Sequence, residues 1–146
     1  MKERVLSMSE RNKTVAYSYY KAYETGDIEA VMKFIAPNYV LHPGGDGKPM
    51  NSEERKRDEM VFFSAFSNIK TIVEDQIAEG DKVASRITMH CTHTGKYQGI
   101  PANGKRVVIP YIDIVLIKDG KIVEEWVEFD MASIVKQINV HKDCIQ

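Results

Sequence analysis

The segment from Arg106 to Asp130 constrains the fold of this chain more than any other stretch. Two alternating apolar runs flank Asp119-Gly120, and Asp-Gly is among the dipeptides best suited to a two-residue turn between antiparallel strands. In an ideal hairpin around this turn, Asp113 lies opposite Trp126. The sheet face that contains this pair then also carries Ile109, Tyr111, Glu128 and Asp130. A face that mixes carboxylates with aromatic rings, within an otherwise apolar hairpin, predicts a lined cavity.

A second hairpin precedes this one. Ile69–Ala78 and Lys82–Thr94 have alternating patterns and meet at Gly80-Asp81, where a leading glycine fits a type II′ turn. The connection from Gly95 to Gly104 joins the two hairpins and is too long for a tight turn. Because loops of this length in a compact domain are often functional, we expect this one, with Tyr97, to border the mouth of the cavity.

The first third of the chain has helical periodicity instead. Ser7 and Glu10 have capping-box spacing and predict a helix that runs to about Thr25. Asp27 can cap a second helix, which Pro37 ends. Both helices carry an apolar stripe that can face a core.

A third helix is predicted to begin at Asn51. Its first two turns, EERKRDE, are charged and expected to be solvated, whereas Met60 and Phe63 point inward. A short helix follows Asp130, which is a natural N-cap. Three helices, four long antiparallel strands and a short helix predict one α+β domain over residues 1–146, with the helices on one face of the sheet.

Composition excludes several classes of protein. The formal net charge is −1, and no run of Lys and Arg forms a basic stripe, so we expect no nucleic-acid partner. No apolar run is long enough for a signal peptide or a membrane span, which predicts a cytoplasmic protein without a membrane partner. The two cysteines, Cys91 and Cys144, form no disulfide framework.

The histidines of the second hairpin do not predict a metal site. His90 and His93 flank Cys91, but strand residues three apart point to opposite faces and cannot converge on one ion. No phosphate-binding loop is present either. We therefore expect neither a metal nor another cofactor, and His93 is instead a candidate for the lining of the cavity.

Three segments carry a resemblance to a known family: YETGDIEAVMKFIAPNYVLHPG, IAEGDKVASRITMHCTHTGKYQGIPANGKRV and DGKIVEEWVEFD. Together with the order of elements, from about Val15 to Ile138, they resemble the SnoaL-like polyketide cyclases. This family belongs to the nuclear transport factor 2-like superfamily, together with ketosteroid isomerase. The resemblance implies a cone-shaped fold in which a strongly curved antiparallel sheet wraps three N-terminal helices around a deep apolar cavity. It also implies homo-oligomers, usually dimers that meet through the sheet.

The resemblance also implies a chemistry. Family members close a ring by intramolecular aldol condensation without metal or cofactor, and an Asp in the last strand is their acid/base. Counted from DGKI, that Asp falls on Val127, and a neighbouring family His falls on Asp113. Both positions reach the cavity in the family, which implies a bulge near Glu124–Val127. A one-residue slip would move Glu128 and Asp130 to the other face.

These observations predict a small-molecule pocket. In one interpretation the chain is a cofactor-free cyclase or isomerase that acts on a small apolar carbonyl compound by carboxylate acid/base catalysis. The candidate acid/base residues are Asp113, ranked first for its mid-strand position, then Glu128, Asp130 and the rim residue His42. The expected ligand-binding residues are Tyr23, Met60, Phe63, Met89, His93, Tyr97, Ile109, Tyr111 and Trp126. The alternative is a non-catalytic domain that binds a hydrophobic ligand or a partner.

The other face of the main hairpin is too apolar to face water. In the ideal register it carries Val108, Ile112, Ile114, Leu116, Val123, Val127 and Phe129. One sheet face packs on the helices, so the other should pack on a second subunit, most simply around a two-fold axis. We expect a homodimer that forms through the sheet.

Overall fold

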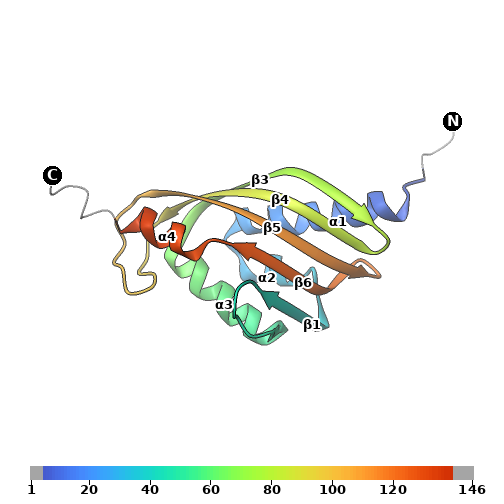
Figure 1. The fold of residues 1–146 in the computed structure, drawn as a ribbon, viewed down its shortest axis with the longest axis horizontal. Coiled ribbons are helices and arrows are strands. Elements are labelled where there is room, and N and C mark those ends of the chain that lie inside the picture. The colour runs from blue at the N-terminus through green and yellow to red at the C-terminus, as the bar shows by residue number, and fades with distance from the viewer. Residues whose placement is uncertain (1–4, 140–146) are drawn as a thin grey trace.

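A six-stranded sheet and four α-helices form the fold (Figure 1), which the computed structural model describes for residues 5–139. The helices are α1 (Met8–Ala22), α2 (Ile28–Met32), α3 (Ser52–Ala65) and α4 (Met131–Ile138), with a 3₁₀ turn, η1 (Tyr23–Thr25), after α1. The strands are β1 (Ile35–Pro43), β2 (Met50–Asn51), β3 (Phe66–Glu79), β4 (Lys82–His93), β5 (Arg106–Lys118) and β6 (Lys121–Phe129). Cys91 is a free, buried thiol, and Cys144 lies outside the described residues. No helix in the described part of the chain is both long and apolar enough to cross a bilayer.

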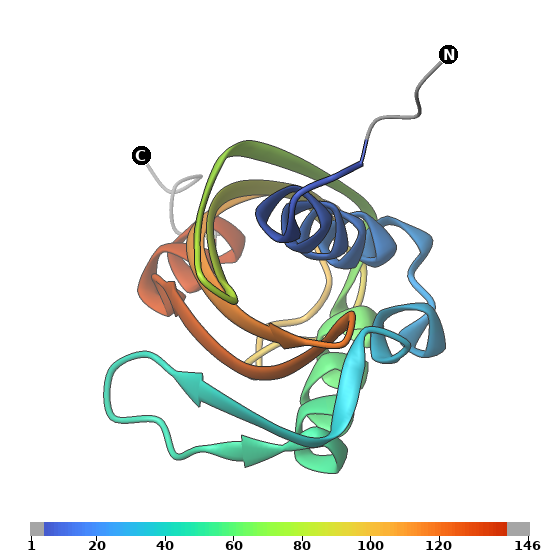
Figure 2. The same cartoon turned by 90° about the vertical axis from the view of Figure 1, so that its right-hand side faces the viewer.

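The strands are ordered β2-β1-β6-β5-β4-β3 across the sheet. Only β1 and β6 run parallel; the other neighbours are antiparallel. In the end-on view of Figure 2 the sheet curls strongly, and α1 and α3 lie along its open, concave side. The predicted α+β fold, with a curved sheet wrapped on the helices and a short helix at the end, is confirmed.

Both predicted capping boxes form, at Ser7 with Glu10 and at Asn51 with Glu54. In each box the N-cap side chain accepts the N3 amide, and the glutamate accepts the N-cap amide, so two otherwise unpaired donors are satisfied. The second helix is shorter than predicted, because β1 has already begun before Pro37 is reached.

The turn at Asp119-Gly120 forms as predicted. Both residues have positive φ (50° and 76°), as a type I′ turn requires, and Lys118 pairs with Lys121. After the next pair, Ile117 with Ile122, the register shifts by one residue, because Val123 forms a bulge and has no partner on β5. The bulge implied by the family resemblance is therefore present, one residue before the expected segment Glu124–Val127.

Relative to an ideal hairpin, the bulge moves each later residue of β6 to the opposite face of the sheet. Asp113 pairs with Val127 rather than with Trp126, so the ideal register is wrong by one residue along this stretch. Asp113 and Val127 are both buried on the concave face, as the resemblance implies, and so is Glu125. Trp126 and Glu128 alternate with them and lie on the outer face.

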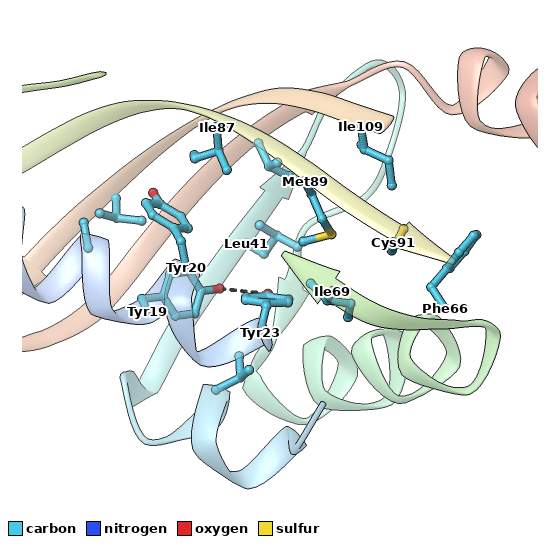
Figure 3. Close-up of a cluster of buried hydrophobic side chains, with 14 of the residues drawn as sticks. Tyr19, Tyr20, Tyr23, Leu41, Phe66, Ile69, Ile87, Met89, Cys91 and Ile109 are labelled. Carbon is cyan, nitrogen blue, oxygen red and sulfur yellow. Dashed lines mark hydrogen bonds between the residues drawn. The ribbon is translucent and has the colours of Figure 1, made fainter. Parts of the chain in front are cut away.

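The core fills the space between the concave face and α1 (Figure 3). Tyr19 and Tyr20 on α1 are almost fully buried, with ring centroids 5.4 Å apart. In Figure 3 they lie below Ile87 and Met89 of β4, and Leu41 of β1 belongs to the same cluster. Packing these tyrosines into the cone brings their hydroxyl groups to its interior, where they meet the buried carboxylates.

Candidate active site

A cavity of about 190 Å³ lies inside the cone. One end is polar and is lined by Tyr19, Tyr23, Arg55, Glu59 and Glu125. The other end is apolar and is lined by Met89, Ile109, Val127, Phe129, Met131 and Ile134. A small compound with an apolar body and one or more polar groups fits such a lining.

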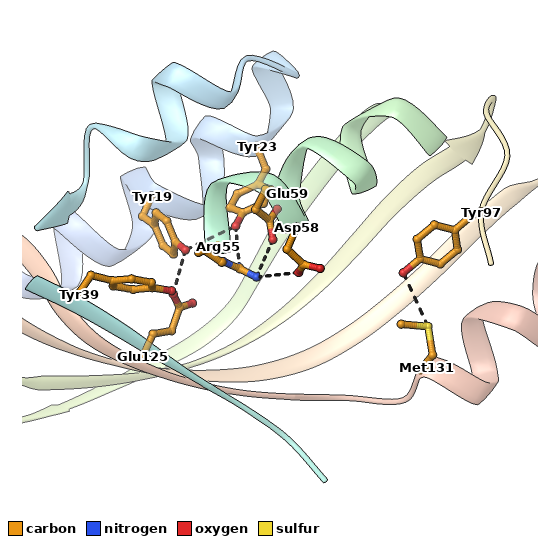
Figure 4. Close-up of polar contacts among 9 residues, drawn as sticks. All are labelled: Tyr19, Tyr23, Tyr39, Arg55, Asp58, Glu59, Tyr97, Glu125 and Met131. Atoms are coloured by element: carbon orange, nitrogen blue, oxygen red, sulfur yellow. Dashed lines mark hydrogen bonds and ion pairs between the residues drawn. The ribbon is translucent and has the colours of Figure 1, made fainter. Parts of the chain in front are cut away.

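Glu125 is the carboxylate that β6 presents to this cavity. Its residue surface is only 2% exposed. The hydroxyl of Tyr19 donates a hydrogen bond to Oε1 at 2.9 Å, and the hydroxyl of Tyr39 donates to the same oxygen at 2.6 Å (Figure 4). Both phenols bind Oε1, and the side chain of Asp113 also hydrogen-bonds to Glu125.

Asp113 lies on β5, on the same face of the sheet as Glu125, and its partner on β6, Val127, is two residues from Glu125. It is fully buried, and the hydroxyl of Tyr20 donates to Oδ2 at 2.7 Å. Burial raises the pKa of Asp113 well above its usual range, and the nearby charge of Glu125 raises it further. Asp113 therefore keeps its proton to a higher pH than an ordinary aspartate does. Tyr20 and Tyr111 line the cavity, whereas Asp113 is not part of the lining.

The raised pKa of Asp113 predicts how stability depends on pH. The folded state holds the Asp113 proton more tightly than the unfolded chain, so this contribution is full below the unfolded pKa of about 3.9 and is lost as pH rises towards the folded pKa. Asp113→Asn removes the titrating group, and its amide can still accept from Tyr20 and donate to Glu125. We expect the variant to gain stability relative to the wild type between pH 4 and pH 8, measured by urea unfolding. A constant difference across this range would contradict the assignment.

Arg55 and Glu59 form a buried ion pair on α3. Arg55 Nη1 lies 2.6 Å from Glu59 Oε1, and Nη2 donates to the Tyr23 hydroxyl at 3.0 Å (Figure 4). Burial alone would lower the pKa of the Arg55 guanidinium, but the charge of Glu59 holds it well above its usual value. Burial raises the pKa of Glu59, although Arg55 opposes this shift. The hydroxyls of Tyr19 and Tyr23 lie 3.4 Å apart and connect this pair to Glu125.

Five of the residues expected to bind ligand line the cavity: Tyr23, Met89, Tyr97, Ile109 and Tyr111. The loop from Gly95 to Gly104 borders the cavity as predicted, because Tyr97 and Gln98 contribute to the lining. Tyr97 also donates to the sulfur of Met131 at 3.7 Å, which joins the loop to α4.

The other four expected ligand contacts lie outside the lining. Met60 is 51% exposed on α3, so its predicted inward direction is wrong. Phe63 packs on the ring of the lining residue Tyr23, with ring centroids 5.8 Å apart, and does not itself line the cavity. His93 is buried deeper along β4, where Nδ1 lies 3.2 Å from Asn103 Oδ1. Trp126 is on the outer face because of the bulge.

None of the four acid/base candidates lines the cavity, and three of them do not lie on the concave face at all. Glu128 is exposed on the outer face. Asp130 caps α4 by accepting the Ser133 amide at 3.2 Å, the alternative that its sequence position offers. His42 lies on the outer face, 2.6 Å from a carboxylate oxygen of Glu124 and stacked on Trp126. The expected cavity positions of these three residues are wrong.

Sequence reasoning missed the polar end of the cavity. An ideal hairpin places Glu125 on the outer face of the sheet. The one extra residue of the bulge, Val123, moves Glu125 to the concave face. The charged start of α3 predicts that Arg55 and Glu59 face solvent, yet they lie one helical turn apart and continue the apolar stripe of Phe62 and Phe66. That spacing was the available signal.

A curved α+β sheet that encloses one cavity, with a buried carboxylate in its wall, defines a nuclear transport factor 2-like pocket protein. The model of the SnoaL-like polyketide cyclase family matches residues 13–138, and the chain belongs to this family.

Two similar proteins are cyclases by name. Aklanonic acid methyl ester cyclase DnrD from Streptomyces peucetius is 30% identical over 106 residues, which cover 70% of this chain and 72% of that protein. Aklanonic acid methyl ester cyclase DauD from Streptomyces sp. (strain C5) is 27% identical over 110 residues. That match covers 70% of this chain and 65% of DauD, just under two thirds of its length.

Solved structures agree with the fold. AclR from Streptomyces galilaeus, named as a candidate hydroxylase, has a TM-score of 0.82 at 27% identity, covering 91% of this chain and 98% of AclR. IdmH from Streptomyces antibioticus, named as a candidate polyketide cyclase, has a TM-score of 0.76 at 26% identity. That match covers 88% of this chain and 99% of IdmH.

Proposed function

We propose that the protein is a cofactor-independent enzyme that closes a ring in a small, mainly apolar carbonyl compound by an intramolecular aldol reaction. The observation that carries this proposal is Glu125, a buried carboxylate in the cavity wall with one oxygen held by two phenols. The names of the relatives DnrD and DauD support ring closure as the reaction. We expect the enzyme to act in the cytoplasm, which the free thiol of Cys91 supports.

In this reaction the Glu125 carboxylate removes a proton from the carbon next to a substrate carbonyl. The electron pair of that C–H bond moves to the carbonyl oxygen and forms an enolate. The enolate carbon then attacks a second carbonyl of the same molecule, a C–C bond forms, and the oxygen of the attacked carbonyl takes a proton. The product is an isomer of the substrate, so the balance needs neither an oxidant nor a reductant.

The surroundings of Glu125 suit it to this role. Burial makes Asp113 hold its own proton, so we assign the role of base to Glu125, the acidic side chain of this pair that lines the cavity. The cavity lining contains one cationic side chain, Arg55, and three acidic ones, Asp58, Glu59 and Glu125. A neutral ketone or ester therefore fits the cavity better than a free acid does.

The test uses the apolar diketone 4-phenylheptane-2,6-dione in deuterium oxide. We expect the protein to exchange the protons next to the carbonyls and to form the cyclic aldol, followed by NMR and mass spectrometry. Calorimetric binding without exchange or closure above the uncatalysed rate would make the chain a non-catalytic binding domain. Absence of both binding and conversion would contradict the substrate class.

We also propose that two subunits meet through the outer face of the sheet. Ile72, Val108 and Ile112 are more than a third exposed there, which is unusual for apolar side chains grouped on one surface. Val127 and Phe129, expected on this face, line the cavity instead. Trp126 takes their place on the outer face, with Lys82 Nζ 5.0 Å from its ring centroid.

Light scattering at micromolar concentration should therefore give the mass of a dimer. Ile112→Asp places a charge on the outer face and should yield monomers. Met60→Glu is the matched control, since Met60 is equally exposed but lies on α3, away from the outer face. A monomeric wild type would refute the dimer, and loss of the dimer in Met60→Glu would place the interface elsewhere.

A further inference from the structure

We propose that Arg55 and Glu59 form a second carbonyl subsite, which holds the attacked carbonyl of a dicarbonyl substrate and delivers a proton to its oxygen. This inference rests on the proposed function, in which Glu125 generates the enolate. Ring closure requires two proton transfers at different atoms of the substrate. Glu125 provides for the first, and the second needs a donor elsewhere in the cavity.

Arg55 has donor capacity that the protein itself does not use. Its side chain is 12% exposed, and Nη1 and Nη2 are bonded to Glu59 and Tyr23. Among the described residues, three buried side-chain atoms have no hydrogen-bond partner: Arg55 Nε, His93 Nε2 and Asp113 Oδ1. Of these three residues only Arg55 lines the cavity. A buried donor without a partner costs free energy unless an acceptor binds there, and a carbonyl oxygen is such an acceptor.

Glu59 is placed to supply the proton. It is 6% exposed, lines the same cavity and is fixed by Arg55 of its own helix at 2.6 Å. Because burial raises the pKa of Glu59, its carboxyl group can carry a proton closer to neutral pH than an ordinary glutamate can. Its neighbour Asp58 also faces Arg55, at 3.7 Å, but the Asp58 side chain is 54% exposed.

The two carboxylates belong to opposite walls of the cavity. Figure 4 shows Glu125 reaching up from the sheet, with Arg55 and Glu59 on α3 above it. Between them, Tyr19 donates to Glu125 at 2.9 Å and its hydroxyl lies 3.4 Å from that of Tyr23. The Tyr23 hydroxyl also interacts with Glu59. A substrate between the walls can present one carbonyl to each end.

The two glutamates account for both proton transfers of the reaction. Glu125 takes the proton from carbon, and Glu59 gives its proton to the alkoxide that forms when the second carbonyl is attacked. Glu125 is then protonated and Glu59 is ionised. Transfer from Glu125 through the hydroxyls of Tyr19 and Tyr23 to Glu59 restores both groups, so no other reactant is consumed.

Glu59→Gln separates the two steps with 4-phenylheptane-2,6-dione as the probe. We expect the variant to retain deuterium exchange within a few-fold of the wild type, while ring closure falls by about 10²-fold. In the wild type the ratio of closure to exchange should fall as pH rises through the raised pKa of Glu59, since the donor must be protonated. This pH dependence should disappear in Glu59→Gln.

Glu53→Gln is the matched control, because Glu53 is an exposed carboxylate of the same helix that does not line the cavity. It should keep both exchange and closure near the wild-type rates. Closure by Glu59→Gln at the wild-type rate would overturn the inference, whereas a wild type that performs neither step would overturn the proposed function.

A binding measurement tests the subsite in a variant that should still fold, and the Glu125→Gln background prevents turnover. In the variant that also carries Arg55→Met and Glu59→Gln, both members of the ion pair are replaced, so neither is left as an unpaired buried charge. Glu125→Gln alone should bind 4-phenylheptane-2,6-dione about tenfold more tightly than 4-phenylheptan-2-one, which has a methylene group in place of the second carbonyl. The variant without the ion pair should bind the two compounds equally. Equal affinities in Glu125→Gln alone would exclude the second subsite.

Discussion

Glu125→Gln should slow both deuterium exchange and ring closure by about 10²–10⁴-fold, the usual effect of removing a positioned general base. Glutamine has nearly the same size and can still accept the hydrogen bonds of Tyr19 and Tyr39, but it cannot take a proton at neutral pH. Affinity for the diketone, measured by calorimetry, should stay within a few-fold of the wild type. The expected loss is therefore confined to the chemical step.

The matched control is Glu124→Gln. Glu124 is the preceding residue of the same strand, but it lies on the outer face and pairs with His42 at 2.6 Å. Its substitution should leave exchange and closure unchanged. Equal losses in the two variants would show that the effect is not specific to the cavity, and an undiminished rate in Glu125→Gln would leave the base unassigned.

Gly95→Ala should cost about 3 kcal/mol of folding free energy, near the upper end for inserting a group into a packed site. A Cβ at this position would lie 1.9 Å from the backbone oxygen of Ser64, so the end of α3 and the start of the cavity loop cannot stay where they are. The amides of Thr94 and Gly95 both donate to Ala65 O at 2.9 Å, and a displaced loop would weaken both bonds.

Urea unfolding of Gly95→Ala and Gly99→Ala measures this effect. Gly99 is in the same loop, but its Cβ would meet nothing within 4 Å, and its φ of +77° leaves only the conformational strain of about 1 kcal/mol. A loss of stability in Gly95→Ala no larger than that in Gly99→Ala would show that the contact with Ser64 is relieved at little cost.

Most of the fold could be predicted from the sequence, because the local signals for helices, strands and turns agreed with one another. The capping boxes at Ser7 and Asn51 begin helices where predicted, and the Asp119-Gly120 turn closes the main hairpin. Each of these signals acts over a few residues and needs no tertiary partner. Periodicity then separates helices from strands, and the order of elements fixes the architecture.

The residues of the site were harder to predict from the sequence, since their geometry depends on long-range packing. Asp113 was placed correctly on the concave face, whereas Glu128 and Trp126 were assigned to it through the ideal register. No local pattern marks Val123 as the bulged residue. In the same way, the charges of Arg55 and Glu59 are typical of a solvated helix face until the sheet curls over them.

The bulge at Val123 links what the two faces of β6 carry. Loss of the bulge at unchanged chain length would move every later residue of β6 one step along β5, which would bring Trp126 into the cavity and move Glu125 to the outer face. Deletion of Val123 would instead remove the bulge and keep the present pairs, so Glu125 would still face the cavity. The proposed catalytic wall and the proposed assembly surface therefore depend on the same extra residue between the turn and Glu124.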